Sequence, residues 1–199
     1  MKYIKKGKEP KEFTEWKGRA NDNRKRSYKN LGNPEKSIVK QALMEEQGYI
    51  CCYCEQELIK TVSHIEHFLP QTSYPEKDID FSNMLCSCQN QVKKGEPRHC
   101  GNLKADKELA IFPLDENCEQ YFKYTYDGYI EAVDEKAKTT IETLGLDIDK
   151  LNALRKEVIE PFIDDSLTED DLRKFVSEYL KKVDDKYQPF YTTIKFLFE

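Results

Sequence analysis

The sequence predicts an α+β fold, in which a small core of short strands pinned by cysteines precedes a helix-rich extension that contains a β-hairpin. The core is indicated by a C-x-x-C pair, an acidic residue next to a histidine, and two cysteines later in the chain. The extension is indicated by capped segments of helical period that follow a turn dipeptide. In order, the core residues are Cys51, Cys54, Glu66, His67, Cys88 and Cys100.

The composition is that of a polar globular chain, with 199 residues, 38% hydrophobic and 35% charged. This length favours one core domain with an appended part. No apolar run approaches the length that spans a bilayer, and residues 1–10 are Lys-rich without an apolar signal segment. We therefore expect a cytoplasmic protein with no membrane contact, whose seven cysteines serve as metal ligands or buried thiols rather than disulfides.

The net charge of −5 is unevenly distributed along the chain. Residues 1–40 carry thirteen Lys/Arg against five Asp/Glu, whereas residues 108–199 carry twelve against twenty-two. A basic segment can contact phosphates even in an acidic protein. The acidic part either faces a protein partner, away from nucleic acid, or only solvates helix faces. We divide the chain into a basic arm (residues 1–33), a core (34–112) and an extension (113–199) that we expect to face a partner.

The arm has few apolar positions, so we expect it to be partly ordered or to become ordered on binding. Its basic residues alternate with scattered aromatic residues, a composition suited to phosphate contact and base stacking. In the alternative, Phe13 and Trp16 dock the arm onto the core.

The core is expected to begin with a helix. Asn33-Pro34 suits the start of this helix and Gly48 its end. Residues 49–54 then form a strand or a tight knuckle, and alternation over residues 61–69 predicts a strand. A further helix is expected over residues 101–110.

The extension opens with a hairpin around Asp127-Gly128, a favourable turn dipeptide. Helices are expected over residues 134–144, 149–163 and 168–183, the last capped by Thr168. The third helix carries an apolar stripe at helical spacing, which either docks a partner or faces the core. The stripe consists of Leu172, Phe175, Val176, Tyr179 and Leu180.

The first two cysteines have the spacing of thiolates that share one tetrahedral zinc ion from a tight turn. A second pair must come from Cys86, Cys88 and Cys100. Cys86 and Cys88 are too close in sequence to chelate comfortably on an extended segment, so we select Cys88 and Cys100. We expect a structural zinc on Cys51, Cys54, Cys88 and Cys100, while Cys52, Cys86 and Cys118 remain ordinary buried thiols.

Glu66 and His67 combine two groups that phosphodiester hydrolysis needs, a hard ligand for a cation and a base that activates water. The unperturbed pKa of imidazole makes His67 a candidate base, and Glu66 suits Mg²⁺ or Mn²⁺. Neighbours on a strand face opposite sides, so both reach one site only at a strand end or kink. Asn83 offers an amide that could brace the intervening loop. His64 is either a supporting residue of the site or a core-facing polar residue.

Four segments carry a family resemblance: Cys51-Cys-Tyr-Cys54-Glu, Ile65-Glu-His-Phe68, Phe81-Ser-Asn-Met-Leu-Cys-Ser-Cys88 and His99-Cys-Gly-Asn-Leu-Lys104. They resemble the HNH endonuclease superfamily, and in particular the PtuB-like nucleases associated with retrons and the Septu anti-phage system. The likeness covers roughly residues 34–163. It implies a ββα-metal (HNH) core in which Glu66 is a metal ligand, His67 the catalytic base and Asn83 the loop-bracing residue.

The resemblance also implies a role. It indicates a metal-dependent endonuclease that acts as the effector of a bacterial anti-phage defence system. Its expected partners are an ABC/SMC-like ATPase of the PtuA type, a retron complex, and nucleic acid, with DNA favoured over RNA. The alternative is a non-catalytic zinc-knuckle module that binds nucleic acid or a partner ATPase.

One position departs from the HNH pattern. Gly101 stands where the pattern has a His or Asn ligand directly after the second cysteine of the distal pair. Either Asn102 or His99 then supplies the further ligand of the catalytic metal, or that ligand is absent. We favour Asn102 because an amide oxygen suits a hard cation. The candidates for nucleic-acid binding are Arg24, Lys25, Arg26, Lys93, Lys94, Arg98 and Lys104.

Overall fold

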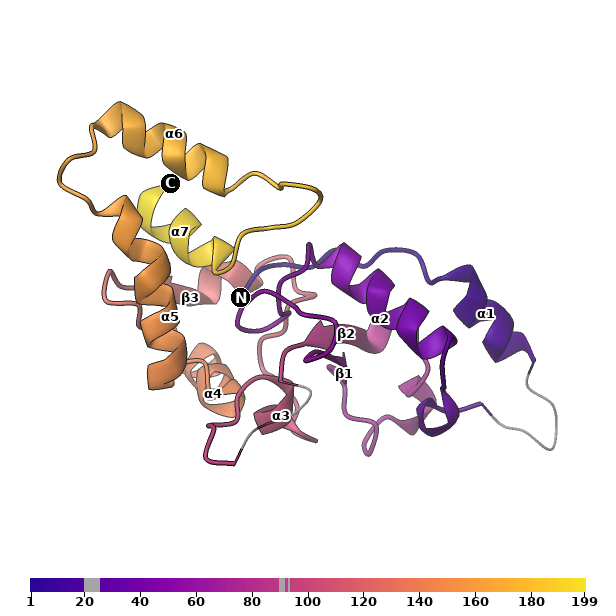
Figure 1. The fold of residues 1–199 in the computed structure, drawn as a ribbon. Coiled ribbons are helices and arrows are strands. Elements are labelled where there is room, and N and C mark those ends of the chain that lie inside the picture. Colours follow the sequence, from indigo (N-terminus) through magenta and orange to yellow (C-terminus); the bar gives the residue numbers. More distant parts are fainter. Residues whose placement is uncertain (20–25, 90–91, 93) are drawn as a thin grey trace.

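The computed structural model describes residues 1–19, 26–89, 92 and 94–199, and confirms the α+β class. Its two sheets are small antiparallel pairs: β1 (His64–His67) with β2 (Met84–Ser87), and β3 (Phe122–Tyr124) with β4 (Ile130–Ala132). The β1–β2 hairpin lies in the middle of the molecule, with α1 and α2 on one side and α4 to α7 on the other (Figure 1).

The N-terminal segment is a packed part of the molecule, which corrects the expectation of an arm. It forms the helix α1 (Lys11–Gly18), in which Phe13 is 0% and Trp16 is 5% exposed. Both side chains belong to the main hydrophobic core, together with Met1 and Ile4. Large aromatic side chains gain more from burial than from exposure, so the docking alternative holds.

Elements of the core region are shorter than expected. α2 (Glu35–Glu46) starts directly after Pro34 and ends before Gly48, whose φ is +60°. It packs against β1 and β2. α3 (Gly101–Lys104) is a single turn, because Ala105 has a φ of +47° and a left-handed residue ends a helix. β2 was not expected from the sequence, since all four of its residues are buried and show no alternation.

The extension follows the local signals closely. The β3–β4 hairpin turns at Gly128, where an added Cβ would lie 2.3 Å from the Asn152 carbonyl oxygen. Asp134 caps α4 (Glu135–Leu144) at its N-terminus. The remaining helices are α5 (Asp149–Ile159), α6 (Glu169–Tyr179) and α7 (Tyr191–Phe198), and the 3-10 turns are η1 (Tyr28–Asn30), η2 (Pro75–Lys77), η3 (Phe81–Asn83), η4 (Cys118–Tyr121) and η5 (Glu160–Phe162).

The apolar stripe of α6 faces the interior. Its five residues pack in a second hydrophobic cluster formed with α5, η5 and α7, around Ile159, Phe162 and Ile194. The Phe162 and Phe175 rings are stacked with centroids 4.2 Å apart. The core-facing alternative therefore holds, and the stripe is not a free docking surface. No helix in the described part of the chain is long and apolar enough to cross a membrane.

The proposed segment boundaries do not separate independent cores. The main hydrophobic core runs from Met1 to Leu151 in sequence and so crosses both boundaries, at residues 33 and 112. The C-terminal helix is also tied to the cysteine knuckle, because the backbone N–H of Thr192 donates to Glu55 Oε2 at 2.8 Å.

Candidate functional site

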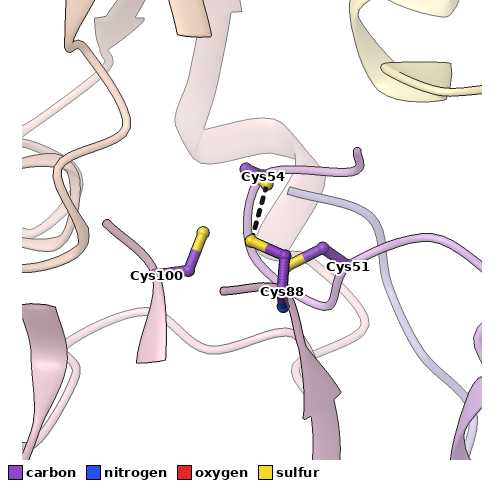
Figure 2. A group of neighbouring side chains, drawn as sticks. All are labelled: Cys51, Cys54, Cys88 and Cys100. Atoms are coloured by element: carbon purple, nitrogen blue, oxygen red, sulfur yellow. Dashed lines mark hydrogen bonds between the residues drawn. The ribbon is translucent and has the colours of Figure 1, made fainter. Parts of the chain in front are cut away.

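Four cysteine side chains, called the cysteine cluster below, gather from the turn at residues 51–54, the residue after β2 and the residue before α3 (Figure 2). The four Sγ atoms lie within 4.8 Å of one another, and those of Cys54 and Cys88 are 3.7 Å apart. Four thiolates around a tetrahedral zinc ion with bonds of about 2.3 Å are about 3.8 Å apart, so the donors and their spacing fit such an ion. The members are Cys51, Cys54, Cys88 and Cys100, the four selected from the sequence.

The electrostatics of the cluster also favour a cation. Burial alone would raise the pKa of the Cys51 thiol, but hydrogen bonds from neighbouring thiols, Cys100 first, outweigh it and hold the pKa well below its usual value. Burial and the Cys51 sulfur in turn raise the pKa of Cys100 well above its usual value. A dication bound by the four sulfurs would displace their protons. The thiols of Cys52, Cys86 and Cys118 lie outside the cluster and are buried, as expected.

His99 lies against the cysteine cluster and not against Glu66. Its Nδ1 is 3.1 Å from Cys100 Sγ and 3.8 Å from Cys88 Sγ, and the residue is fully buried. Cys100 has a φ of +54°, which redirects the chain between residue 99 and α3. The expectation that His99 serves as a ligand beside Glu66 is corrected by this placement.

Glu66 is a buried carboxylate in a polar pocket. Its Oε1 accepts from the Tyr53 hydroxyl at 3.1 Å and pairs with Lys104 Nζ at 3.0 Å, while its Oε2 lies 3.5 Å from His64 Nε2. Burial alone would raise the pKa of Glu66, but the His64 ring and the Lys104 ammonium outweigh it and lower the pKa. The carboxylate is therefore ionised at neutral pH, as a cation ligand must be.

Lys104 serves inside the protein rather than at its surface. Its side chain is 0% exposed, and besides pairing with Glu66 its Nζ donates to the His67 carbonyl at 2.9 Å. A fully buried ammonium cannot reach a nucleic-acid phosphate in this structure, so the expected role in nucleic-acid binding is corrected. The sequence could not reveal this, because lysine is seldom fully buried unless it is paired.

His67 ends β1 and faces away from the Glu66 carboxylate. Its Nε2 lies 2.8 Å from the Asp78 carbonyl, and its Nδ1 lies 2.9 Å from Gln71 Nε2. These partners assign the proton to Nε2 and leave Nδ1 as the acceptor. Burial lowers the pKa of His67, although the Asp78 carbonyl and Glu66 act in the opposite direction. The imidazole is thus neutral near pH 7, the form that a general base requires.

Asn83 braces the loop between the two strands with both ends of its amide. Its Nδ2 donates to the carbonyls of Leu69 and Lys77 at 3.1 and 3.2 Å, and its Oδ1 accepts from the Leu69 N–H at 2.9 Å. Asn83 therefore fixes the position of the loop that carries Gln71 and Asp78. These two residues are the hydrogen-bond partners of the His67 ring, so the ring is held in place as well. This is the bracing expected from the sequence.

His64 lies directly beside the Glu66 carboxylate, with its Nε2 3.5 Å from Glu66 Oε2. Strand alternation places His64 and Glu66 on one face of β1, and the buried Nδ1 of His64 has no hydrogen-bond partner among the described residues. A Cβ added to Gly101 would lie 2.4 Å from Glu66 Oε2 and 2.7 Å from His64 Nε2. Any side chain larger than glycine at position 101 would force these two side chains to shift. The period-two spacing of His64 and Glu66 was the signal that could have revealed the pair.

Asn102 sits on α3, half-buried, with its amide nitrogen donating to the Gln89 carbonyl. It lines the same cleft as His64, in contrast to His99. Of the other basic candidates, Lys94 and Arg98 are exposed, and the Arg26 guanidinium lies over the Trp16 ring at 4.8 Å. Arg24, Lys25 and Lys93 lie outside the described residues.

The cysteine cluster thus lies beside a short strand pair that carries Glu66 and His67, and Asn83 braces the loop between the two strands. No family model matches the chain. One relative is a Vibrio cholerae protein whose name describes it as the inferred HNH endonuclease of retron Vc95. It is 32% identical to this chain over 138 residues, which cover 64% of this chain and 66% of the relative. The Septu protein PtuB of Bacillus thuringiensis is 31% identical over 119 residues, 58% of this chain and 44% of the relative.

These two similarities show that the chain belongs to the PtuB-like HNH family. The matched region spans less than two thirds of the length of each relative.

Proposed function

We propose that the protein is a metal-dependent HNH endonuclease that hydrolyses nucleic-acid phosphodiester bonds, with β1, β2 and α3 as its ββα-metal core. The observation that carries this proposal is the buried, ionised Glu66 on the same short strand as a neutral His67. The two relatives support it, since one is named as an HNH endonuclease.

The donor set at Glu66 fits a catalytic cation. A carboxylate oxygen and an imidazole nitrogen 3.5 Å apart are ligands that Mn²⁺ accepts, and the carboxylate also suits Mg²⁺. Glu66 and His64 would hold the ion, and the amide of Asn102 lines the same cleft. When bound, such an ion stabilises the negative charge of the phosphate and of the leaving oxygen.

The chain's own residues supply the proton transfer. His67 would accept the proton of the attacking water at Nδ1, in place of the hydrogen bond that Gln71 now donates there. The Asp78 carbonyl accepts from Nε2–H, so it orients the ring and stabilises the imidazolium that forms. Asn83 keeps this loop at a constant distance from β1.

A zinc ion on the cysteine cluster would serve structure. It would join the knuckle, the end of β2 and the start of α3, three segments that few regular hydrogen bonds connect. Thiolate ligands of this kind persist in a reducing compartment, which agrees with action in the cytoplasm.

The names of the relatives point to an anti-phage defence system. We propose that the protein is the nuclease effector of such a system, acts on DNA in preference to RNA, and works with a PtuA-like ABC/SMC ATPase or within a retron complex. A gene for such an ATPase next to the gene for this protein would support the proposal.

Cleavage of labelled plasmid and RNA in Mg²⁺ or Mn²⁺, with and without the partner ATPase, tests the activity. His67→Ala and Glu66→Gln should each lower the rate by about 10²-fold or more, whereas the exposed Glu76→Gln should not change it. Unchanged cleavage by His67→Ala would overturn the catalytic assignment. Binding of nucleic acid without cleavage in any of these conditions would favour the non-catalytic zinc module.

Metal binding provides a readout that is independent of activity. Titration calorimetry with Mn²⁺ should show one site weaker than the zinc site, and both His64→Ala and Glu66→Gln should weaken it about tenfold or more. His99→Ala should leave Mn²⁺ binding unchanged, because its ring lies against the sulfurs. Equal Mn²⁺ affinity in His64→Ala would remove His64 from the ligand set.

A further inference from the structure

A cleft with basic walls opens between α2 and the start of β1. It encloses about 630 Å³. Two of its lysines, Lys36 and Lys40, come from α2, and the third, Lys60, comes from the loop that precedes β1. None of these lysines was among the basic residues singled out from the sequence, because only the fold brings Lys60 beside the two lysines of α2. We call this feature the basic cleft; it is lined by Tyr28, Asn33, Lys36, Ser37, Lys40, Lys60, Ser63, His64, Ile65 and Asn102.

The positive charge of the basic cleft is not neutralised from within. None of its lining residues is acidic, and within the described residues none of the three lysines forms an ion pair with a carboxylate. Lys40 Nζ donates to the backbone carbonyls of Lys60 and Ser63, and Lys36 Nζ lies 4.9 Å from the centre of the Tyr28 ring. Burial lowers the pKa of Lys40, Cys86 acts in the opposite direction, and the nearby charges of Lys60 and Lys36 lower the pKa further. Unpaired cations gathered on one concave surface attract a polyanion.

The basic cleft leads to both halves of the candidate site. His64 lines it, and its Nε2 is 3.5 Å from the Glu66 carboxylate. Tyr28 also lines it, and its ring meets the His67 ring edge-on with centroids 4.6 Å apart. A phosphate group held in the cleft would therefore lie beside two side chains, one of which contacts the Glu66 carboxylate and the other the His67 ring.

We propose that the basic cleft holds the phosphodiester backbone of the nucleic-acid substrate, with Lys36, Lys40 and Lys60 on phosphates that flank the scissile one. This inference rests on the proposed nuclease function and assigns its substrate path. An ammonium group has three donors, so Lys40 can contact a phosphate while it keeps its two carbonyl partners. Lysine contacts to phosphates carry no base information, and binding in this cleft should be strong in low salt and independent of sequence.

Binding is tested with the full-length His67→Ala protein, so that cleavage does not interfere. Fluorescence anisotropy follows labelled duplex DNA, single-stranded DNA and RNA of one sequence over a series of salt concentrations. For duplex DNA, Lys36→Gln with Lys60→Gln should reduce the slope of log affinity against log salt by about 2, and the triple change with Lys40→Gln by about 3. A control with the same charge change on exposed lysines elsewhere, Lys136→Gln, Lys174→Gln and Lys181→Gln, should keep the original slope.

The outcomes separate the cleft from the catalytic proposal. A double variant that binds all three nucleic acids with the affinity and salt slope of the control overturns the basic cleft, as does the absence of binding by the His67→Ala parent. If wild-type protein cleaves and His67→Ala does not, the nuclease proposal stands even when the cleft fails. If His67→Ala cleaves like wild type while the double variant loses binding, the cleft stands and the base assignment fails. The double variant retains Lys40 and its carbonyl contacts, and circular dichroism and zinc content check that it is folded.

Discussion

The β1–α3 region and the C-terminal helices are stabilised in different ways. Around β1, buried polar groups dominate: the Glu66–Lys104 pair, the Asn83 amide and the cysteine cluster. Around α5 to α7 the buried contacts are between apolar and aromatic side chains, with Phe162 against Phe175 at the centre. A buried polar group stabilises only when every partner is present, whereas apolar contacts tolerate substitution. The β1–α3 region should therefore be destabilised by the loss of a single polar group or ion. The α5 to α7 region should be destabilised mainly by substitutions that reduce the volume of a buried side chain.

Removing the ion proposed for the cysteine cluster should have the largest effect. Structural zinc contributes on the order of 10 kcal/mol of binding free energy to small folds. Cys88→Ser, or a strong chelator, should abolish zinc binding and expose the amides of β1, β2 and α3 to hydrogen exchange while α5 to α7 stay protected. Cys118→Ser, at a buried thiol outside the cluster, should retain zinc. If α5 to α7 lost protection together with β1, β2 and α3, the two regions would not be stabilised independently.

Lys104→Ala should destabilise the protein by about 3–5 kcal/mol, because it leaves the Glu66 carboxylate buried without its cation. Urea unfolding measures the loss, and the exposed Lys107→Ala is the matched control. Combining Lys104→Met with Glu66→Gln should recover part of the stability, since both charges are then absent. A loss below about 1 kcal/mol in the single variant would show that the pair is not the buried unit described above.

Phe162→Ala should destabilise the C-terminal helices by about 3 kcal/mol through the loss of a buried aromatic ring. Zinc content and nucleic-acid binding should be unchanged, because the second cluster does not touch the basic cleft or the cysteine cluster. The neighbouring Ile163, which is 47% exposed, should tolerate Ala within about 0.5 kcal/mol. Loss of zinc from Phe162→Ala would refute the independence of the two regions.

A change at Glu119 should produce the smallest effect. Its carboxylate joins residues 2 and 3 to Lys195 of α7. Burial alone would raise the pKa of Glu119, but the Tyr3 N–H, Lys2 and Lys195 outweigh it and lower the pKa below 4.5. The folded state therefore binds fewer protons than the unfolded state at acid pH. Stability from this group is full above about pH 4.5 and is lost as the pH falls through the folded pKa. Glu119→Gln should flatten the dependence of Tm on pH in that window. An unchanged slope would show that the contacts of Glu119 do not contribute to the pH dependence of stability.

Local signals predicted much of the extension and of the metal chemistry. The turn at Asp127-Gly128 and the caps at Asp134 and Thr168 depend on neighbouring residues only, and the elements they predict are present. The four cluster cysteines were selected by spacing alone. In contrast, α1, β2 and α7 were missed, because their residues are helical or extended through packing against distant segments and carry weak signals of their own.

What the sequence by itself determined is the set of groups available for chemistry: four thiolates, a Glu-His pair and an asparagine that can brace a loop. Tertiary structure decided which of them meet. It buried Lys104 against Glu66, moved His99 to the sulfurs, brought His64 to the carboxylate and gathered three lysines in one cleft. The physical reason is that four-residue strands and a one-turn helix have little stability of their own, so cross-chain contacts determine their register and the direction of every side chain on them.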